Sequence, residues 1–335
     1  MPGAPFKALD CGYEFINAKV RARRSYVYED ERLDNLCRCR NLFDLIATLF
    51  PGQEFADHIA LQRALVARHV EELAGLVKYL NRRHAVFYRS LLERYVVENV
   101  KVALRALERT GNVASGAAHM VPLPADLHPT VTELLALERR EDLPGLFGDE
   151  ALVKAANTGL GHAGRAGNVF YLEASLDSAL HESLHERASI FKGEVRRKMR
   201  LLIDAEIAVY NTMFLIRAKS TFGLAFEAIR DFLVATEETP PGAYASLMHV
   251  EDMNEMARRI PNGMLRQAAG PIMQTPYDLE AQLWRRIFRE SNRIFYASIL
   301  DPAGLLAYTY IRRVELLNLL RLVEGLRYGM DGGGW

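Results

Sequence analysis

Hydrophobic residues recur every three or four positions along most of the chain, a period that predicts helices rather than strands. The clearest segments are 32–50, 58–83 and 85–109, which are rich in Leu, Ala, Glu and Arg. Pro51 and Gly52 separate the first two of these helices. No run of alternating β-branched residues is long enough to require a sheet. The pattern therefore predicts an all-α fold.

A second pattern occurs three times along the chain. Each copy opens with Leu-(Gln or Glu)-x-x-Leu, has an Asn 37 or 38 residues after the Gln or Glu, and has a small residue seven positions later. The three copies are Gln62, Asn99 and Ala106; Glu173, Asn211 and Ala218; and Glu280, Asn318 and Gly325. The period of about 110 residues exceeds the roughly 20–50 of solenoid repeats. It predicts three copies of a small helical domain, and it favours a scaffold over a single-pocket enzyme.

Two linkers divide the copies. The segment 110–129 contains two glycines and three prolines, and the segment 237–242 reads Glu-Glu-Thr-Pro-Pro-Gly. We therefore expect domains at 1–115 with the N-terminal helix, 116–240, and 241–335 with the C-terminal helix. A glycine-rich segment at 158–167 is expected to be a loop within the second copy, and the tail 331–335 is expected to fray.

Helical phase places each of the three asparagines on an apolar stripe. We expect each amide to be buried, to find a hydrogen-bond partner and to fix the register of its helix, with a ligand-binding role as the alternative. The small residue seven positions on should allow a neighbouring helix to approach closely. Arg105 and Arg217 lie six positions after the Asn of their copies, where the third copy has Glu324. These arginines face the polar side, where they are either solvated or contact a partner protein.

Composition excludes several classes of protein. Half of the 335 residues are hydrophobic, and Lys plus Arg equals Asp plus Glu at 42 each, so no net charge recruits nucleic acid. The first residues lack the order of a signal peptide. The longest uncharged apolar stretches, such as 207–216, fall well short of the roughly 20 residues that span a bilayer. Three cysteines make no disulfide framework, which is typical of a reducing cytoplasm.

Two motifs resemble catalytic or cofactor sites. The segment 181–185 reads His-Glu-Ser-Leu-His, which on a helix could hold zinc with Glu182 activating a water and Glu206 as third ligand. The charged residues that follow His185 favour a solvated His/Glu face instead. The segment 159–164 fits Gly-x-Gly-x-x-Gly, but no strand precedes it, so we interpret it as an interhelical loop. We expect no catalytic residue, no metal and no cofactor.

The chain resembles the C subunits of the V-type (archaeal and bacterial) ATP synthases, the counterparts of the d subunits of eukaryotic V-ATPases. The resemblance rests on residues 13–25, on the segments around Asn99 and Asn211, and on 310–327, in this order and spacing. Lys19 stands where the family usually has Arg. The acidic residue that the family has three positions before the central Asn is kept only as Glu315.

The resemblance implies three pseudo-symmetric helical domains around a central funnel. It further implies a non-catalytic socket that receives the central stalk and sits on the membrane proteolipid ring, in ATP-linked proton or sodium transport. Such a protein would be peripheral, on the cytoplasmic face of the membrane. Two other hypotheses remain: a zinc-dependent hydrolase that uses 181–185, and a helical interaction module unrelated to any rotor.

Overall fold

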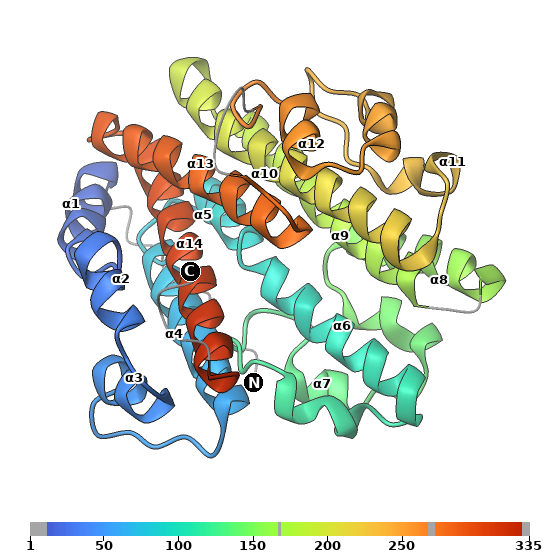
Figure 1. Cartoon of the computed structure of the whole chain (residues 1–335), viewed down its shortest axis with the longest axis horizontal. Helices are drawn as coiled ribbons and strands as arrows, with labels where there is room; N and C mark the ends of the chain where they lie inside the picture. Colours follow the sequence, from blue (N-terminus) through green and yellow to red (C-terminus); the bar gives the residue numbers. More distant parts are fainter. Residues whose placement is uncertain (1–11, 167–168, 267–271, 330–335) are drawn as a thin grey trace.

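The computed structural model describes residues 12–166, 169–266 and 272–329, and every regular element within these ranges is a helix (Figure 1). The α-helices are α1 (Gly12–Arg24), α2 (Asp30–Cys37), α3 (Leu42–Leu49), α4 (His58–Val77), α5 (Arg82–Ser90), α6 (Glu93–Thr110), α7 (Val131–Leu135), α8 (Glu150–Ala166), α9 (Phe170–Arg187), α10 (Gly193–Phe222), α11 (Phe226–Ile229), α12 (Met253–Arg259), α13 (Pro276–Ala297) and α14 (Pro302–Arg327). Short 3-10 helices are η1 (Val113–His119), η2 (Arg140–Leu146), η3 (Ala188–Ile190), η4 (Arg230–Phe232) and η5 (Pro241–His249). The prediction of an all-α fold is confirmed.

Capping asparagines divide two of the predicted helices. The segment 32–50 breaks before α3, where the Asn41 side chain accepts a hydrogen bond from the Asp44 amide at 2.9 Å. The segment 58–83 breaks before α5, where Asn81 accepts from the His84 amide at 3.0 Å. Each such N-cap stabilises a helix start by about 1 kcal/mol, enough to end a continuous apolar pattern locally. The prediction of single helices over these segments is therefore wrong, and so is that for 85–109, since α5 ends at Ser90 and α6 begins at Glu93.

Apart from Thr110, the last residue of α6, both predicted linkers lack α-helix. In the first, Gly111 adopts a φ of 69° and ends α6, after which η1 and extended backbone lead to residue 130. The second passes directly into η5 at Pro241. Glycine thus ends α6 at the first linker, and proline begins η5 at the second.

The glycine-rich segment at 158–167 is not a loop in its described part, because α8 continues to Ala166. A Cβ atom on Gly159 would lie 2.7 Å from the Leu172 Cα of α9, closer than any real contact. The glycine therefore allows α8 and α9 to pack with their backbones close together. Residue 167 and the tail 331–335 lie outside the described residues.

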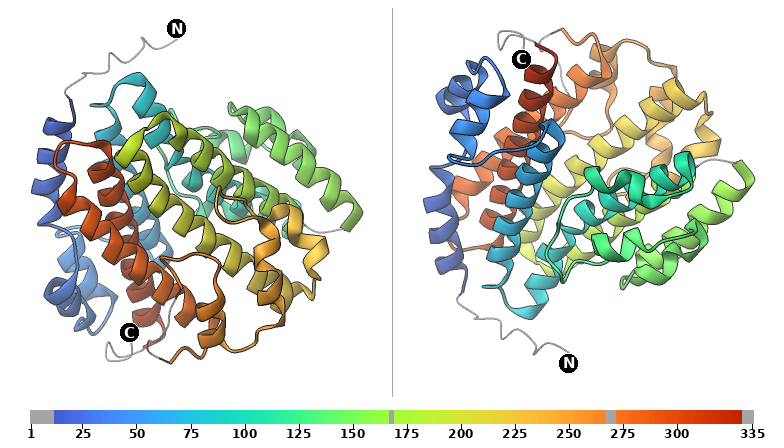
Figure 2. Two further views of the ribbon diagram at one scale, coloured as in Figure 1. Left: turned by 90° about the horizontal axis from the view of Figure 1, so that it is seen from above. Right: turned by 90° about the horizontal axis from the view of Figure 1, so that it is seen from below.

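The buried apolar residues form three clusters. The largest runs from Ile16 in α1 to Val314 in α14, the second from Val97 in α6 to Ala179 in α9. The third joins α2, α3 and α4 to Leu316, Leu319, Leu322 and Val323 of α14. The last long helix therefore packs against the first ones, and α4 and α14 lie side by side although they are far apart in the sequence (Figure 2).

The long helices of the three copies contact one another in a cyclic order. Helix α6 of the first copy packs against α9 of the second, and α10 of the second packs against α13 of the third. Helix α14 of the third copy packs against α4 of the first. Among the described helices, none combines the length and the apolar character that crossing a bilayer requires.

Candidate functional site

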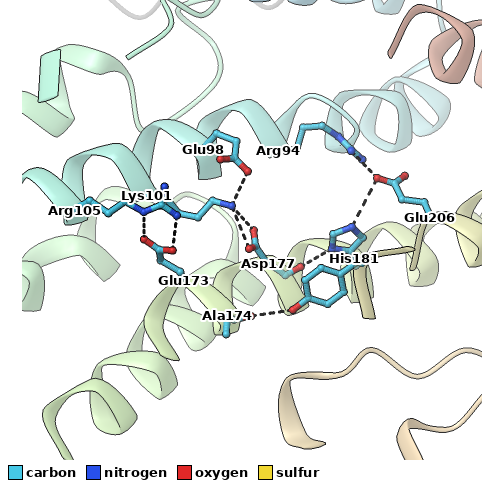
Figure 3. A network of polar contacts seen from close by, with 10 residues as sticks. Arg94, Glu98, Lys101, Arg105, Glu173, Ala174, Asp177, His181 and Glu206 are labelled. Atoms are coloured by element: carbon cyan, nitrogen blue, oxygen red, sulfur yellow. Dashed lines mark hydrogen bonds and ion pairs between the residues drawn. The ribbon is translucent and has the colours of Figure 1, made fainter. Parts of the chain in front are cut away.

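A buried carboxylate lies where three of the long helices meet. Glu206 of α10 is 2 % exposed, and its Oε1 forms an ion pair with Arg94 of α6 at 2.6 Å. The same oxygen pairs with Arg313 of α14, while the Tyr310 hydroxyl of α14 donates to Oε2 at 2.5 Å. We call these four residues the hub. Figure 3 shows Arg94 of the hub reaching Glu206 from the neighbouring helix.

The three charged residues of the hub occupy the same position in the three copies. Arg94, Glu206 and Arg313 each lie five residues before the central Asn of their copy. Because one carboxylate binds both guanidinium groups, a single contact joins all three copies. The sequence interpretation considered Glu206 only as a zinc ligand and missed the two arginines. Aligning the copies on their asparagines would have revealed a charged residue at one offset in all three.

The hub is ionised at neutral pH. Burial by itself raises the pKa of Glu206, but the charge of Arg94, the nearby His181 ring and the Tyr310 hydroxyl outweigh burial and lower this pKa to about 2. For Arg94, burial lowers the pKa and the Glu206 carboxylate more than compensates, so the guanidinium stays charged. The ring of Trp284 also faces Arg313, at 4.3 Å from the guanidinium carbon to the ring centre. Each charge is therefore buried together with a group that stabilises it.

Ion pairs extend from the hub along the contact between α6 and α9 (Figure 3). Lys101 Nζ of α6 lies 3.0 Å from Asp177 Oδ1 of α9 and 2.6 Å from Glu98. Arg105 binds Glu173 through two parallel hydrogen bonds of 2.7 Å each. Arg105 was expected to be solvated or to contact a partner protein, and it instead contacts the Leu-Glu motif of the next copy.

A corresponding contact closes the interface between α14 and α4. Gln62 of the first motif donates a hydrogen bond of 2.6 Å to Glu324, which occupies the position of Arg105 in the third copy. Arg105 and Glu324 each lie six residues after the Asn of their copy. At these two interfaces, each binds the Gln or Glu of the Leu-(Gln or Glu)-x-x-Leu motif of the next copy. The third such residue, Arg217, is exposed on α10 and makes no ion pair with another described residue.

Asn99 and Asn211 are buried and bind backbone in the same way. Asn99 donates to the Val121 carbonyl at 2.8 Å and accepts from the Val121 amide at 2.8 Å. Asn211 does the same with Val234, at 2.8 and 2.9 Å. Each side-chain amide therefore binds both the N–H and the C=O of one backbone residue, as a neighbouring β-strand would. It holds an extended segment against its helix.

Asn318 departs from this arrangement. It is only half-buried, and within the described part of the chain its side chain makes no hydrogen bond. The buried face of α14 instead passes through Glu315, Leu319 and Leu322. Glu315, 4 % exposed, accepts a hydrogen bond of 2.7 Å from the Tyr28 amide. The expectation of a buried, bonded amide is therefore wrong for the third copy.

The small residues that follow the asparagines are all buried. Ala106 is 3 % exposed, Ala218 is fully buried, and Gly325 lies on the buried side of α14. At Ala106 the close approach is direct, because a Cβ atom on Gly116 of η1 would lie 2.9 Å from the Ala106 Cβ. The chain that follows α6 therefore returns tightly against it.

The two histidines of the His-Glu-x-x-His motif are buried, at 8 % and 9 % exposure, so the expectation of a solvated face is wrong for them, whereas Glu182 is exposed. His181 donates from Nδ1 to the Asp177 carbonyl at 2.7 Å, and its Nε2 lies 3.8 Å from Glu206. His185 binds Asp204 at 2.8 Å through Nδ1 and accepts from Arg200 at 3.2 Å through Nε2.

These contacts do not form a zinc site. The two rings bind different partners, and both nitrogens of His185 are occupied. Glu206, the third ligand that the motif would need, already binds two guanidinium groups. Within residues 12–166, 169–266 and 272–329, no group of three or more His, Cys, Asp or Glu side chains is arranged to hold a metal ion.

An open cleft of about 600 Å³ lies between α4, α13, α14 and the segment after η1. It is lined by Gln62 and Glu280, the polar residues of two motifs, and by Val121, which is bound to Asn99. Arg321 stacks on Tyr277 at its edge, with 4.8 Å from the guanidinium carbon to the ring centre. The cleft therefore gathers repeat positions of the first and third copies.

The fold and the hub define an all-α protein whose buried polar residues hold long helices together rather than form a metal site. The family described as ATP synthase (C/AC39) subunit matches residues 16–332, nearly the whole chain. The chain belongs to this family. The resemblance found in the sequence is thereby confirmed.

A curated relative is the C subunit of the A-type ATP synthase of Methanocaldococcus jannaschii. It is 23 % identical to this chain over 238 residues. The aligned part covers 67 % of this chain and 58 % of the relative.

Proposed function

We propose that the chain is a non-catalytic subunit of a rotary V/A-type ATPase that couples the central stalk to the membrane proteolipid ring. Its membership of the ATP synthase (C/AC39) subunit family and the name of its archaeal relative support this role. The complex would drive, or be driven by, proton or sodium transport. The subunit would lie at the cytoplasmic face of the membrane, peripheral to it, and would need no cofactor.

The observation that carries the proposal is the hub together with the cyclic order of helix contacts. Arg94, Glu206 and Arg313 come from corresponding positions, and α6, α10 and α14 each pack on a helix of the next copy. This arrangement is what three pseudo-symmetric domains, 1–115, 116–240 and 241–335, would produce around a central funnel. In such an arrangement a stalk would enter along the axis of the funnel.

Torque transmission requires that the three domains keep their relative orientation. Apolar contacts are non-directional and let helices slide, whereas hydrogen bonds weaken when their geometry is disturbed. The pair of Arg105 with Glu173, the pair of Gln62 with Glu324 and the hub all cross between copies. They would resist rotation of one domain against another.

Of the two arginines expected to contact a partner, Arg105 is bound within the chain, so we propose only Arg217 as a partner contact. It is exposed on the second copy. At the corresponding position, Arg105 of the first copy and Glu324 of the third bind a residue of the next copy. A carboxylate of a stalk subunit would complete this third position.

Affinity purification tests the proposal. The tagged chain would be recovered from detergent-solubilised native membranes, and its partners identified by mass spectrometry. We expect proteolipid and central-stalk subunits. Recovery of the chain alone would overturn the rotary role.

The same purification tests the proposed contact at Arg217. Arg217→Glu should lower the recovery of stalk subunits, whereas Arg289→Glu, on an exposed residue of α13, should not. Equal recovery with both variants would remove Arg217 from the interface and leave the coupling role standing.

A further inference from the structure

A small cavity adjoins the hub on the side of α4. Its volume is about 10 Å³, and it lies between α4, the start of α6 and α14. It is lined by His69, Leu73, Leu91, Arg94, Tyr95, Thr309, Tyr310 and Arg313. Three hub residues therefore form one wall, and a helix that contributes nothing to the hub directly forms the other.

His69 of α4 lines this cavity and carries an unsatisfied polar atom. The residue is 4 % exposed, and its Nδ1 is fully buried without a hydrogen-bond partner among the described residues. Its ring is held by an edge contact with Tyr95, with 5.7 Å between the ring centres. A buried polar atom without a partner costs about 1–3 kcal/mol, so native proteins rarely leave one.

We propose that this cavity holds one water molecule, hydrogen-bonded to His69 Nδ1 and to a guanidinium group of the hub. The volume fits, since a single water needs roughly 10–15 Å³ measured in this way. Water can both donate and accept, so it can satisfy an imidazole nitrogen and accept from Arg94 or Arg313 at the same time.

Other small ligands fit the site less well. A cation would lie next to two positively charged side chains, Arg94 and Arg313. Their repulsion would be strong, because the dielectric constant of a buried site is low. A chloride ion is larger than water, and the cavity has room for about one water only. The imidazole ring is uncharged, since burial, and secondarily the charges of Arg312 and Arg94, lower the pKa of His69 to about 3.

The water would join α4 to the hub. Helix α4 already carries Gln62, which binds Glu324 of α14. Glu72 of α4 also binds α14, through Arg312 at 2.7 Å. A connection through His69 would tie α4 to the hub itself. A bridging water is nearly as favourable in enthalpy as a direct hydrogen bond, so the connection would be firm without any side chain reaching across.

A crystal structure of the full chain at about 1.2 Å resolution or better would test this, because ring nitrogen and carbon atoms can then be told apart. We expect one ordered water within hydrogen-bond distance of His69 Nδ1 and of Arg94 or Arg313. In His69→Leu, which removes the polar partner, the same peak should be lost or weakened. An empty cavity, or an imidazole turned over so that Nδ1 meets a protein group directly, would overturn the proposal. The wild-type map decides by itself, so the test does not depend on the folding of the variant.

Discussion

Replacing Glu206 by Gln should destabilise the protein by about 3–5 kcal/mol, the usual consequence of removing one partner of a buried ion pair. The substitution keeps the shape of the side chain but leaves two guanidinium groups without a counter-charge. The Arg94 side chain is only 13 % exposed and depends on this carboxylate most. Arg313 is 22 % exposed and keeps its contact with Trp284, so it loses less.

Equilibrium urea unfolding at pH 7 would measure this loss. Far-UV circular dichroism reports the helices, and the fluorescence of Trp284 reports the hub if Trp335 is replaced by Phe. Glu194→Gln is the matched control, since it makes the same change on α10 at an exposed residue and should leave the unfolding free energy nearly unchanged. A difference below about 1 kcal/mol between Glu206→Gln and Glu194→Gln would refute the central position of the hub.

Two extensions sharpen the test. Adding Arg94→Met to Glu206→Gln should recover part of the lost stability, because one uncompensated charge is removed. The pKa of Glu206 is lowered from 4.5 to about 2 in the folded protein, so its stabilising contribution is complete above pH 4.5 and is lost as the pH falls toward 2. Wild type should therefore lose more stability than Glu206→Gln over that window.

Three further substitutions probe other features. Asn211→Ala should cost about 2–3 kcal/mol in urea unfolding, because it leaves two buried backbone groups unpaired, whereas Asn318→Ala should cost below about 1 kcal/mol. Gly159→Ala should lower the unfolding free energy by about 1–3 kcal/mol through its clash with α9, whereas Gly161→Ala, which meets no atom within 4 Å, should raise it by about 0.5–1 kcal/mol. The pKa of His69 falls from 6.5 to about 3 on folding, so stability should decline by up to about 1.4 kcal/mol per pH unit as the pH falls between those values. His69→Gln should remove this part of the slope; an unchanged slope would contradict the burial of an uncharged ring.

The sequence predicted the fold class and the family well, because both depend on patterns repeated over the whole chain. It also predicted correctly that Asn99 and Asn211 are buried. This prediction needs local information only, because helical phase places both residues on the buried side of their helices. The prediction for Asn318 was wrong because the buried face of α14 is set by its contacts with α13 and α4, which no local pattern contains.

The glycines of α8 misled the prediction for a related reason. Glycine promotes turns in an isolated segment, but Gly159 is required by the backbone of α9, which the pattern of α8 does not reveal. The hub was missed because a charged residue on a helix usually faces solvent. Only the arrangement of three helices shows that Arg94 and Arg313 share one carboxylate. The division into three domains stays a prediction.

The cyclic order of contacts has a consequence for how the protein folds. Arg313 follows Glu206 by 107 residues. During synthesis, Arg94 of the first copy can therefore pair with Glu206 of the second long before Arg313 has been made. The contacts of α14 with α1 and α4 close the largest loops, whose entropic cost is met only when most of the structure is in place. We therefore expect the final helix to dock in the slowest folding phase, and chains that stop short of it to expose the apolar surfaces of α3 and α4 to chaperones and proteases.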